Sequence, residues 1–217
     1  RIDNGSYQIS NLDGSSRHRF SPLHLNDTNR SGSGNGTYAL TQVSDRHGNG
    51  YRIVYNEDTG LPHTVIDELG REIWFEFDNL SPLTQIPVYR LTSMGSYNDN
   101  LPEGRELLVR YRYDDNGDLV AVEDAEGFVH RRFGYRRHMM IRHQTTAGLN
   151  TYYQYDHYTP QGRVLRSHTD NGEEWRFAYA DGHTQITDAL GRSEHLYYDH
   201  HGEVVKKVFA DGSSVLT

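Results

Sequence analysis

Along most of the chain, apolar and polar residues alternate with a period of two. The stretch DLVAVED at 118–124 is one example, and Val, Tyr, Phe and Thr occupy the alternating places in many others. This period is typical of a β-strand with one face turned to water, and no segment has a sustained helical period. The pattern predicts an all-β fold with strands of roughly five to seven residues.

Glycine turns separate these strands. Asn-Gly and Asp-Gly steps occur at 116–117, 171–172, 181–182 and 211–212. Glycine supplies the positive φ that tight hairpin turns need, so one strand, one turn and the next strand form a β-hairpin of about 20 residues. Because an isolated hairpin is only marginally stable, we expect the hairpins to pair edge to edge into a long twisted sheet of about 16 strands.

The same residue pattern recurs along the chain at a nearly constant spacing. Each unit has an aromatic residue followed by Asp or Asn, then a Gly, an alternating stretch, and a second Asp before another Gly. Regular spacing of this kind predicts a repeat protein. The repeat-signature positions, to which we assign a structural role, are Tyr55, Asn56, Gly60, Asp67, Gly70, Phe77, Asp78, Tyr113, Asp114, Gly117, Asp124, Gly127, Tyr155, Asp156, Gly162, Asp188, Gly191, Tyr198, Asp199 and Gly202.

The repeats divide the chain unevenly. Residues 38–217 are predicted to form the hairpin array, with the first regular hairpin at 44–55, and residues 1–37 an atypical segment that starts the sheet. Two segments depart from the repeat spacing and are interpreted as insertions: 79–105, around a strand at 88–94, and 136–150. The SGSGNG run at 31–36 is expected to be a flexible turn. The non-Met start and the end in mid-pattern suggest a piece of a longer protein.

Composition narrows the class of protein. Hydrophobic residues make up 35% of the 217 residues and the mean hydropathy is −0.82, which is too polar for a thick core but suits a thin sheet with one wet face. The net charge of −8 and the scattered arginines argue against nucleic acid as a main partner. The chain has no Cys, hence no disulfide or thiolate chemistry. No apolar run reaches the ~20 residues of a membrane span.

The repeated acids have two interpretations. As catalysts, two carboxylates must converge on one substrate; as turn residues, they need only accept hydrogen bonds from nearby backbone amides. A catalytic group is needed once, whereas a turn former is needed once per hairpin. The repetition therefore favours the turn interpretation for Asp114, Asp124, Asp156, Asp188 and Asp199.

Two stretches of the sequence contain residues that could bind a metal ion. Asp114, Asn116 and Asp118 look like the start of a calcium loop, but the Gly comes one residue early for an EF-hand and no flanking helices are predicted. His195, Tyr197, Asp199 and His201 would share one face if HLYYDHH were a single strand. That set offers zinc too few ligands, and the turn at Gly202 places His200 and His201 in solvent. We expect no metal and no cofactor.

Nothing in the sequence indicates an enzyme. There is no G-x-S-x-G elbow and no H-E-x-x-H, and SGSGNG lacks the Lys and the context of a phosphate loop. N-x-S/T sequons would matter only in a eukaryotic ectodomain; they begin at Asn4, Asn26, Asn29 and Asn35.

Aromatic pairs recur on one face of the predicted strands, as at Tyr111 and Tyr113, Tyr153 and Tyr155, and Phe177 and Tyr179. Their first interpretation is packing between neighbouring hairpins. A sugar-stacking platform and the inner wall of a cavity are the alternatives, and the sequence leaves open which face would point inward.

Several of these stretches resemble the RHS, or YD, repeat family. The stretches that carry the resemblance are YRYDDNGDLVAVEDAEG, YYQYDHYTPQGRVLRSHTDNG, VIDELGREIWFEFD and TDALGRSEHLYYDHHGEVV. The resemblance as a whole covers about residues 38–217. The chain departs from the pattern where Asn56 replaces Asp, where FAYADG compresses a unit, and where YTPQG lengthens a turn.

The resemblance implies a fragment of a bacterial RHS toxin shell, in which β-hairpins spiral into a hollow wall around a C-terminal toxin domain. It implies no catalysis by this segment, a role in interbacterial competition through type VI-like secretion, and a path from the bacterial cytoplasm to the outside or into a target cell. The implied partners are the rest of the same chain, the enclosed toxin, a secretion spike and chaperone proteins. The family's Asp-Pro self-cleavage motif is absent from this sequence. A carbohydrate- or cell-surface-binding module is the alternative.

Overall fold

Antiparallel β-strands joined by short turns make up the whole described chain. The computed structural model describes residues 5–23, 37–80 and 88–216, and this part contains no helix. The predicted all-β class is therefore confirmed. The expected turn at 31–36 and the four sequons lie outside the described residues. The described part of the chain has no helix with the length and apolar character that a membrane crossing needs.

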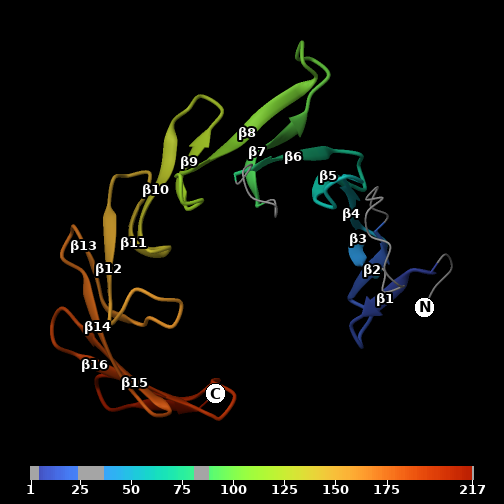
Figure 1. Ribbon diagram of the computed structural model, residues 1–217. Coiled ribbons are helices and arrows are strands. Elements are labelled where there is room, and N and C mark those ends of the chain that lie inside the picture. Colours follow the sequence, from blue (N-terminus) through green and yellow to red (C-terminus); the bar gives the residue numbers. More distant parts are fainter. Residues whose placement is uncertain (1–4, 24–36, 81–87, 217) are drawn as a thin grey trace. The chain divides into compact units, whose positions relative to one another are not determined.

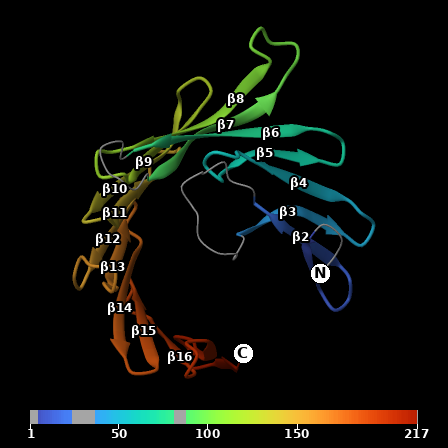
Figure 2. The ribbon, with the colours of Figure 1, turned by 45° about the vertical axis from the view of Figure 1, so that its right-hand side comes forward.

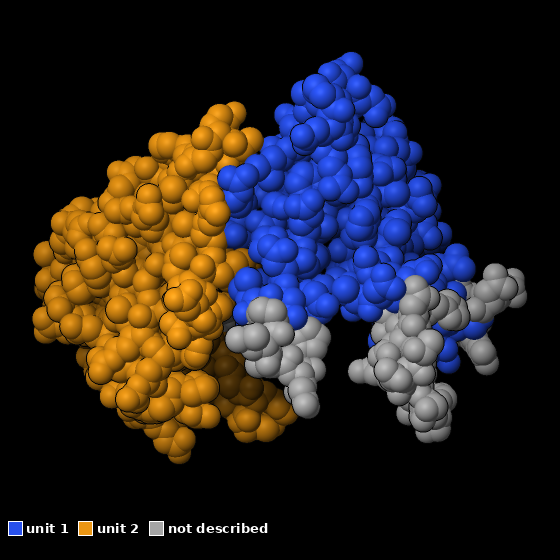
Figure 3. All heavy atoms as spheres, turned by 45° about the horizontal axis from the view of Figure 1, so that its top comes forward, with its two compact units in different colours: residues 1–111 blue, residues 112–217 orange. Residues whose placement is uncertain are grey.

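The chain divides into two compact units, residues 1–111 and 112–217, which Figure 3 colours separately. In the first unit each strand pairs antiparallel with the next one in the chain, and Figure 2 shows β3 to β8 lying side by side in that order. Its strands are β1 (Tyr7–Ser10), β2 (Ser16–Pro22), β3 (Tyr38–Asp45), β4 (Gly50–Tyr55), β5 (Pro62–Asp67), β6 (Glu72–Asn79), β7 (Tyr89–Tyr97) and β8 (Arg105–Tyr113), which ends just past the boundary.

The second unit follows the same rule, with successive strands paired antiparallel from β9 to β18 (Figure 1). Its strands are β9 (Leu119–Asp124), β10 (Val129–Arg136), β11 (Met139–Gln144), β12 (Asn150–Tyr155), β13 (Val164–Thr169), β14 (Glu174–Ala180), β15 (His183–Asp188), β16 (Ser193–Tyr198), β17 (Val204–Val208) and β18 (Ser214–Leu216).

The described strands outnumber the expected 16: the structure has 18. One reason is that regular pairing starts before the expected first hairpin at 44–55. Strands β1 and β2 already form a hairpin, closed by a turn in which the Gly14 amide donates to the Asn11 carbonyl over 2.9 Å. The expected strand at 88–94 corresponds to β7. Strand β11 lies within 136–150, so this segment also takes part in the meander; whether 79–105 and 136–150 are insertions into the repeat stays a prediction.

The sheet is one layer thick within each unit. Among the described residues only three hydrophobic side chains are buried, namely Ile66, Trp74 and Ala121. Most other side chains are half-buried or exposed, as expected for strands that no second layer covers. The thin sheet expected from the composition is what the structure has.

Trp74 owes its burial to a glycine on the neighbouring strand. Trp74 on β6 lies directly opposite Gly95 on β7, and its indole nitrogen donates to the Ser96 carbonyl over 3.0 Å. A Cβ atom at Gly95 would lie 2.4 Å from the Trp74 ring and 1.9 Å from the Glu106 carbonyl oxygen. The missing side chain is thus what lets the indole lie flat against the first unit's sheet.

Replacing this glycine tests the packing. We expect Gly95→Ala to lower the free energy of unfolding by about 2 kcal/mol, because the ring and the backbone of β8 must both move to admit the methyl group. Gly134→Ala is the matched control, since a Cβ there meets Arg142 only at ordinary contact distances of 3.7 and 3.8 Å. Urea denaturation measures both variants, and equal stabilities for the two would contradict the packing account.

Candidate functional site: the repeated turns and the tyrosine face

Most hairpins close with one turn geometry. At Asp188 the backbone amide donates to the Arg192 carbonyl, the Gly191 amide donates back to the Asp188 carbonyl, both over 3.0 Å, and Gly191 has a φ of 80°. Glycine tolerates this φ, and other residues rarely do. The turns with the same two hydrogen bonds begin at Asp45, Asp67, Asp114, Asp124, Thr145, Thr169, Asp188, Asp199 and Phe209.

An Asp in the first position adds its side chain to the turn. Asp188 Oδ1 accepts the amides of Leu190 and Arg192, each over 2.9 Å, and Oδ2 lies 2.7 Å from the Arg192 guanidinium. Asp67 repeats this arrangement with Leu69 and Arg71. Acceptance of one or two turn amides by Oδ1 also occurs at Asp45, Asp114, Asp124, Asp156 and Asp199. These are the hydrogen bonds that the turn interpretation of the acids requires.

The turn hydrogen bonds lower the pKa values of the Asp67, Asp114 and Asp188 carboxyl groups. The Asp118 amide is the main cause for Asp114, and the Arg71 amide for Asp67. At Asp188 partial burial opposes the shift, but the Arg192 side chain and amide outweigh it, so its pKa is also lowered. A general acid needs a pKa raised toward neutrality, which is the opposite direction. The electrostatics therefore match turn formers.

The remaining signature residues lie at strand ends and turns. Asn56 Oδ1 accepts the amides of Asp58 and Thr59, so Asn serves here as Asp does elsewhere. Asp78 departs from this pattern, because it lies inside β6 opposite Arg90. The aromatic members lie at or near the ends of their strands: Tyr55, Phe77, Tyr113, Tyr155 and Tyr198. That these positions form one repeat signature stays a prediction.

The tyrosine hydroxyls have a role at the β-bulges that the sequence analysis does not predict. In the pairing of β12 with β13, Tyr155 lies opposite Val164 and Gln154 opposite Arg166, which leaves Leu165 as an extra residue in a β-bulge. The Tyr179 hydroxyl on the next strand, β14, donates to the Val164 carbonyl over 2.7 Å. A bulge disrupts the ladder of backbone hydrogen bonds, and the hydroxyl gives the carbonyl beside it a partner.

Two other tyrosines do the same at other bulges. Tyr155 donates to the Met140 carbonyl over 2.8 Å, and Tyr55 donates to the Leu40 carbonyl over 2.9 Å. Each acceptor comes just before the extra residue of a bulge. Burial raises the pKa values of the three tyrosines above the ordinary 10.0, so the hydroxyls remain donors at neutral pH. A tyrosine of the following strand thus forms a hydrogen bond at each of these three bulges.

Phe77 stands where this series has a tyrosine. It follows Pro62 by the same spacing at which Tyr55 follows Leu40, and Pro62 lies next to a bulge in β5. A cavity of about 100 Å³ adjoins both Phe77 and Pro62. Sequence inspection could have found the series from this spacing, which links each aromatic to an apolar residue of the preceding strand, but only if the bulges were known.

The strand register sorts the second unit's side chains onto two faces. The face that carries the tyrosine hydroxyl bonds is here called the tyrosine face. It also carries the Glu194–Lys207 ion pair, and its apolar and aromatic side chains are half-buried apart from the exposed Trp175: Phe133, Tyr135, Tyr153, Tyr155, Trp175, Phe177, Tyr179, Ile186, Leu196 and Tyr198. The predicted pairs Tyr153 with Tyr155 and Phe177 with Tyr179 do share this face. The first unit has a similar face with Ile53, Tyr55, Val65, Ile73, Phe75 and Phe77.

The opposite face of the second unit, here called the polar face, carries charged and hydrogen-bonded rows. Glu174 bridges Arg166 and Arg176, with 2.6 Å between each pair of charged atoms, and the two arginines lower its pKa to about 2. His183 and His195 stack and share a hydrogen bond of 2.9 Å. These ion pairs and hydrogen bonds serve many polar groups of this face, whereas Asn150 Oδ1, Arg166 Nε and His168 Nδ1 are buried without a hydrogen-bond partner in the described part of the chain.

The two sets of candidate metal ligands form other hydrogen bonds or lie apart in the structure. Asp114 accepts turn amides, and Asp118 bonds His138 over 2.9 Å. Strand β16 ends at Tyr198, so His195 lies in the sheet whereas Asp199 and His201 belong to the turn, and the zinc set does not come together. The described residues contain no group of three or more His, Cys, Asp or Glu placed to hold a metal ion.

Fold and surface together define a chain of β-hairpins whose second unit has a tyrosine face and a polar face. No family model matches it. It is 34% identical to a stretch of the toxin protein Tse5 of Pseudomonas aeruginosa, over 80% of this chain and 12% of that protein. It is 38% identical to a stretch of the double-stranded DNA deaminase toxin A of Burkholderia cenocepacia, over 44% of this chain and 7% of that protein.

These findings support a toxin-associated RHS-repeat chain, as the resemblance implies. The chain spans only a small part of both relatives. Among solved structures, a chain of the Photorhabdus luminescens Tc holotoxin pore matches 89% of this chain over 13% of its own length, with 13% identity and a TM-score of 0.46. That likeness is too distant to inform function.

Removing one tyrosine hydroxyl tests the bulge bonds. We expect Tyr155→Phe and Tyr179→Phe each to lower the free energy of unfolding by about 1 kcal/mol, because a carbonyl loses its hydrogen bond. Phe77→Tyr should act in the opposite direction, since it adds the hydroxyl that the series lacks there. Tyr197→Phe is the control, because Tyr197 lies on the polar face and is exposed. Equal effects of Tyr179→Phe and Tyr197→Phe in urea melts would refute the assignment.

The turn carboxylates predict an acid-sensitive fold. The folded pKa values of Asp67, Asp114 and Asp188 lie below the ordinary 3.8, so the stability that these three groups contribute is present above pH 3.8 and is lost as the pH falls through the folded values. Urea midpoints at pH 7, 5 and 3 should therefore be similar at the first two and lower at the third. Asp188→Asn keeps the Oδ1 acceptor but cannot titrate, so the decrease in the urea midpoint between pH 5 and pH 3 should be smaller in this variant. In the control Asp181→Asn the decrease should be as large as in the unmodified chain.

Proposed function

We propose that this chain is a segment of an RHS-type shell wall that encloses a toxin domain of the same polypeptide, and that the segment itself is not catalytic. The observation that carries the proposal is a one-layer sheet with an apolar, aromatic face and no second layer among the described residues. An apolar sheet face is stable only when another surface covers it. In a shell, that surface is the enclosed polypeptide.

The tyrosine face is the one we assign to the interior. Its half-buried aromatic residues can cover apolar surface of an incompletely folded cargo, whereas the polar face keeps its ion pairs in water. The open edge of β18 is assigned to further hairpins of a longer chain, since an unpaired strand edge is a site of association. The hairpins would then contain the toxin without bonding to it specifically.

The setting is proposed from the relatives. A toxin protein and a deaminase toxin are both far longer than the stretch that matches here, which supports a wall segment with the toxin elsewhere in the polypeptide. We place the chain in the bacterial cytoplasm before export and then outside the cell or in a target cell. Interbacterial competition by type VI-like secretion, with a spike and chaperones as partners and no nucleic-acid partner, completes the proposal.

A carbohydrate- or cell-surface-binding module is the second candidate. A groove of about 660 Å³ in the second unit lies between the exposed rings of Trp175 and Phe209, with Asp188, Arg192 and Glu194 beside them. Aromatic rings flanked by polar groups suit the stacking of a sugar. Saturable glycan binding by the isolated chain that Trp175→Ala abolishes would favour this candidate over containment.

Cysteine labelling tests which face is enclosed. The chain has no native Cys, so Trp175→Cys on the tyrosine face and Tyr197→Cys on the polar face each introduce a unique thiol at a side chain that is 38% exposed. In the isolated chain both should react with a maleimide at similar rates. When the chain is co-expressed with the rest of its parent polypeptide, we expect the pieces to co-purify and only the thiol at 175 to be protected.

The two cysteine variants control for each other, and together they show which result would contradict the proposal. If the thiol at 197 is protected and the thiol at 175 reacts, the assignment of the inner face is reversed, and the shell proposal is still supported. Equal reactivity at both positions, in a chain that does not co-purify with the remainder, would contradict the containment role itself.

A further inference from the structure

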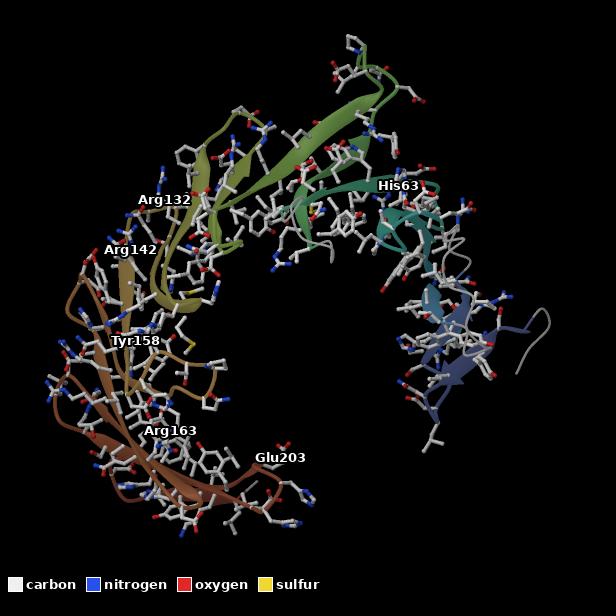
Figure 4. The ribbon with its side chains drawn as sticks, viewed as in Figure 1. His63, Arg132, Arg142, Tyr158, Arg163 and Glu203 are labelled. Carbon is white, nitrogen blue, oxygen red and sulfur yellow. The ribbon has the colours of Figure 1, made fainter. Side chains whose placement is uncertain are left out.

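The β10–β11 hairpin is rich in arginine although the whole chain has a net charge of −8. It carries Arg131, Arg132, Arg136, Arg137 and Arg142, two of which are labelled in Figure 4. The arginines looked scattered in the sequence. The register brings two of them to one place.

Arg132 and Arg142 lie on the polar face as diagonal neighbours. Arg142 on β11 is directly opposite Gly134 on β10, and Arg132 is two residues before that glycine. An added Cβ at Gly134 would lie 3.7 Å from Arg142 Cβ and 3.8 Å from Arg142 Nε, so the Arg142 side chain crosses β10 above the glycine. Diagonal positions are within reach of long side chains, so the two cations share one area of the surface.

No acid of the described chain neutralises this pair. Neither arginine forms an ion pair, and their opposite residues are Ala121, Gln144 and Tyr152, all uncharged. Both side chains are exposed. Two like charges side by side without a counter-charge are unfavourable in the free protein, and a bound anion removes that repulsion.

The same hairpin has an unusual tip. Arg137 and His138 both adopt positive φ, 51° and 64°, in a two-residue turn that normally selects Asn and Gly. They are the non-glycine residues with positive φ in the described chain. His138 is held by Asp118 over 2.9 Å. The tip keeps an arginine where turn chemistry prefers another residue, which adds to the positive charge at this end of β10.

The polar face already contains one example of how arginines hold a carboxylate. Glu174 lies between Arg166 and Arg176, with one carboxylate oxygen 2.6 Å from each guanidinium. Arg132 and Arg142 present a similar pair of cations on the same face without the acid. We propose that Arg132 and Arg142, over Gly134, bind a side-chain carboxylate from an acidic segment of a partner polypeptide.

The overall charge favours such a segment over a phosphate polymer. The turns at both ends of the strands carry ionised Asp residues, and a long polyanion lying across the sheet would meet them. A short acidic peptide can reach the arginine pair alone. The site is on the face opposite to the tyrosine face, so it does not depend on the proposed containment role.

The probe is a fluorescein-labelled oligo-glutamate peptide, titrated with the purified chain at low salt and followed by fluorescence anisotropy. We expect saturable binding that weakens with added salt, and a loss of roughly tenfold or more in affinity for Arg132→Gln/Arg142→Gln. Arg17→Gln/Arg52→Gln is the matched control, with the same change of charge on exposed arginines of the first unit, and should bind as the unmodified chain does.

One further variant and one further measurement separate the geometry from the charge and from folding. Arg132→Lys/Arg142→Lys keeps the charge but loses the planar fork, so binding should be intermediate. Circular dichroism melts of the Arg132→Gln/Arg142→Gln variant should show no loss of stability, because the pair makes no ion pair within the described chain. An equal loss in the two glutamine double variants would overturn the proposal, as would binding of heparin or an oligonucleotide without binding of oligo-glutamate.

Discussion

Hydrogen bonds between neighbouring strands carry the stability that a packed core supplies in most proteins, because this sheet is one layer thick. Only Ile66, Trp74 and Ala121 are buried hydrophobic residues in the described chain. Any break in the ladder of backbone bonds is therefore costly. The bulges beside Leu40, Met140 and Val164 are such breaks, and in each case a tyrosine hydroxyl of the following strand bonds the carbonyl at the break. At these three places the following strand supplies the hydrogen bond that the bulge removes from the ladder.

The bulges also explain how the two faces stay distinct. An extra residue in a strand reverses the alternation of side chains beyond it. In β13 the extra residue, Leu165, lies near the start of the strand, so nearly all of this strand keeps its register with both neighbours. The aromatic residue opposite the bulge, Tyr155, stays on the tyrosine face. The second unit therefore keeps its tyrosine face and its polar face over many strands.

The local part of this design can be predicted from the sequence. An Asp three residues before a Gly, as in Asp188 with Gly191, indicates the turn, its φ and its hydrogen bonds, because all of them lie within a few residues. The hydroxyl bond of Tyr179 could not be predicted, because its partner Val164 is defined by the register of another strand pair. The pairing of Arg132 with Arg142 was missed for the same reason: it depends on Gly134 lying opposite Arg142. Interactions across strands require the register.

The alternation of side chains allows the chain to contact two partners at once. Along β10, Arg132 and Gly134 face one side of the sheet while Phe133 and Tyr135 face the other. A polypeptide that covers the tyrosine face leaves the arginine pair in water, and an acidic segment on the arginine pair leaves the aromatic rings untouched. Because the sheet has no second layer, neither contact has to displace packed residues. A thin wall of this kind can hold a cargo on one face and recognise a protein partner on the other.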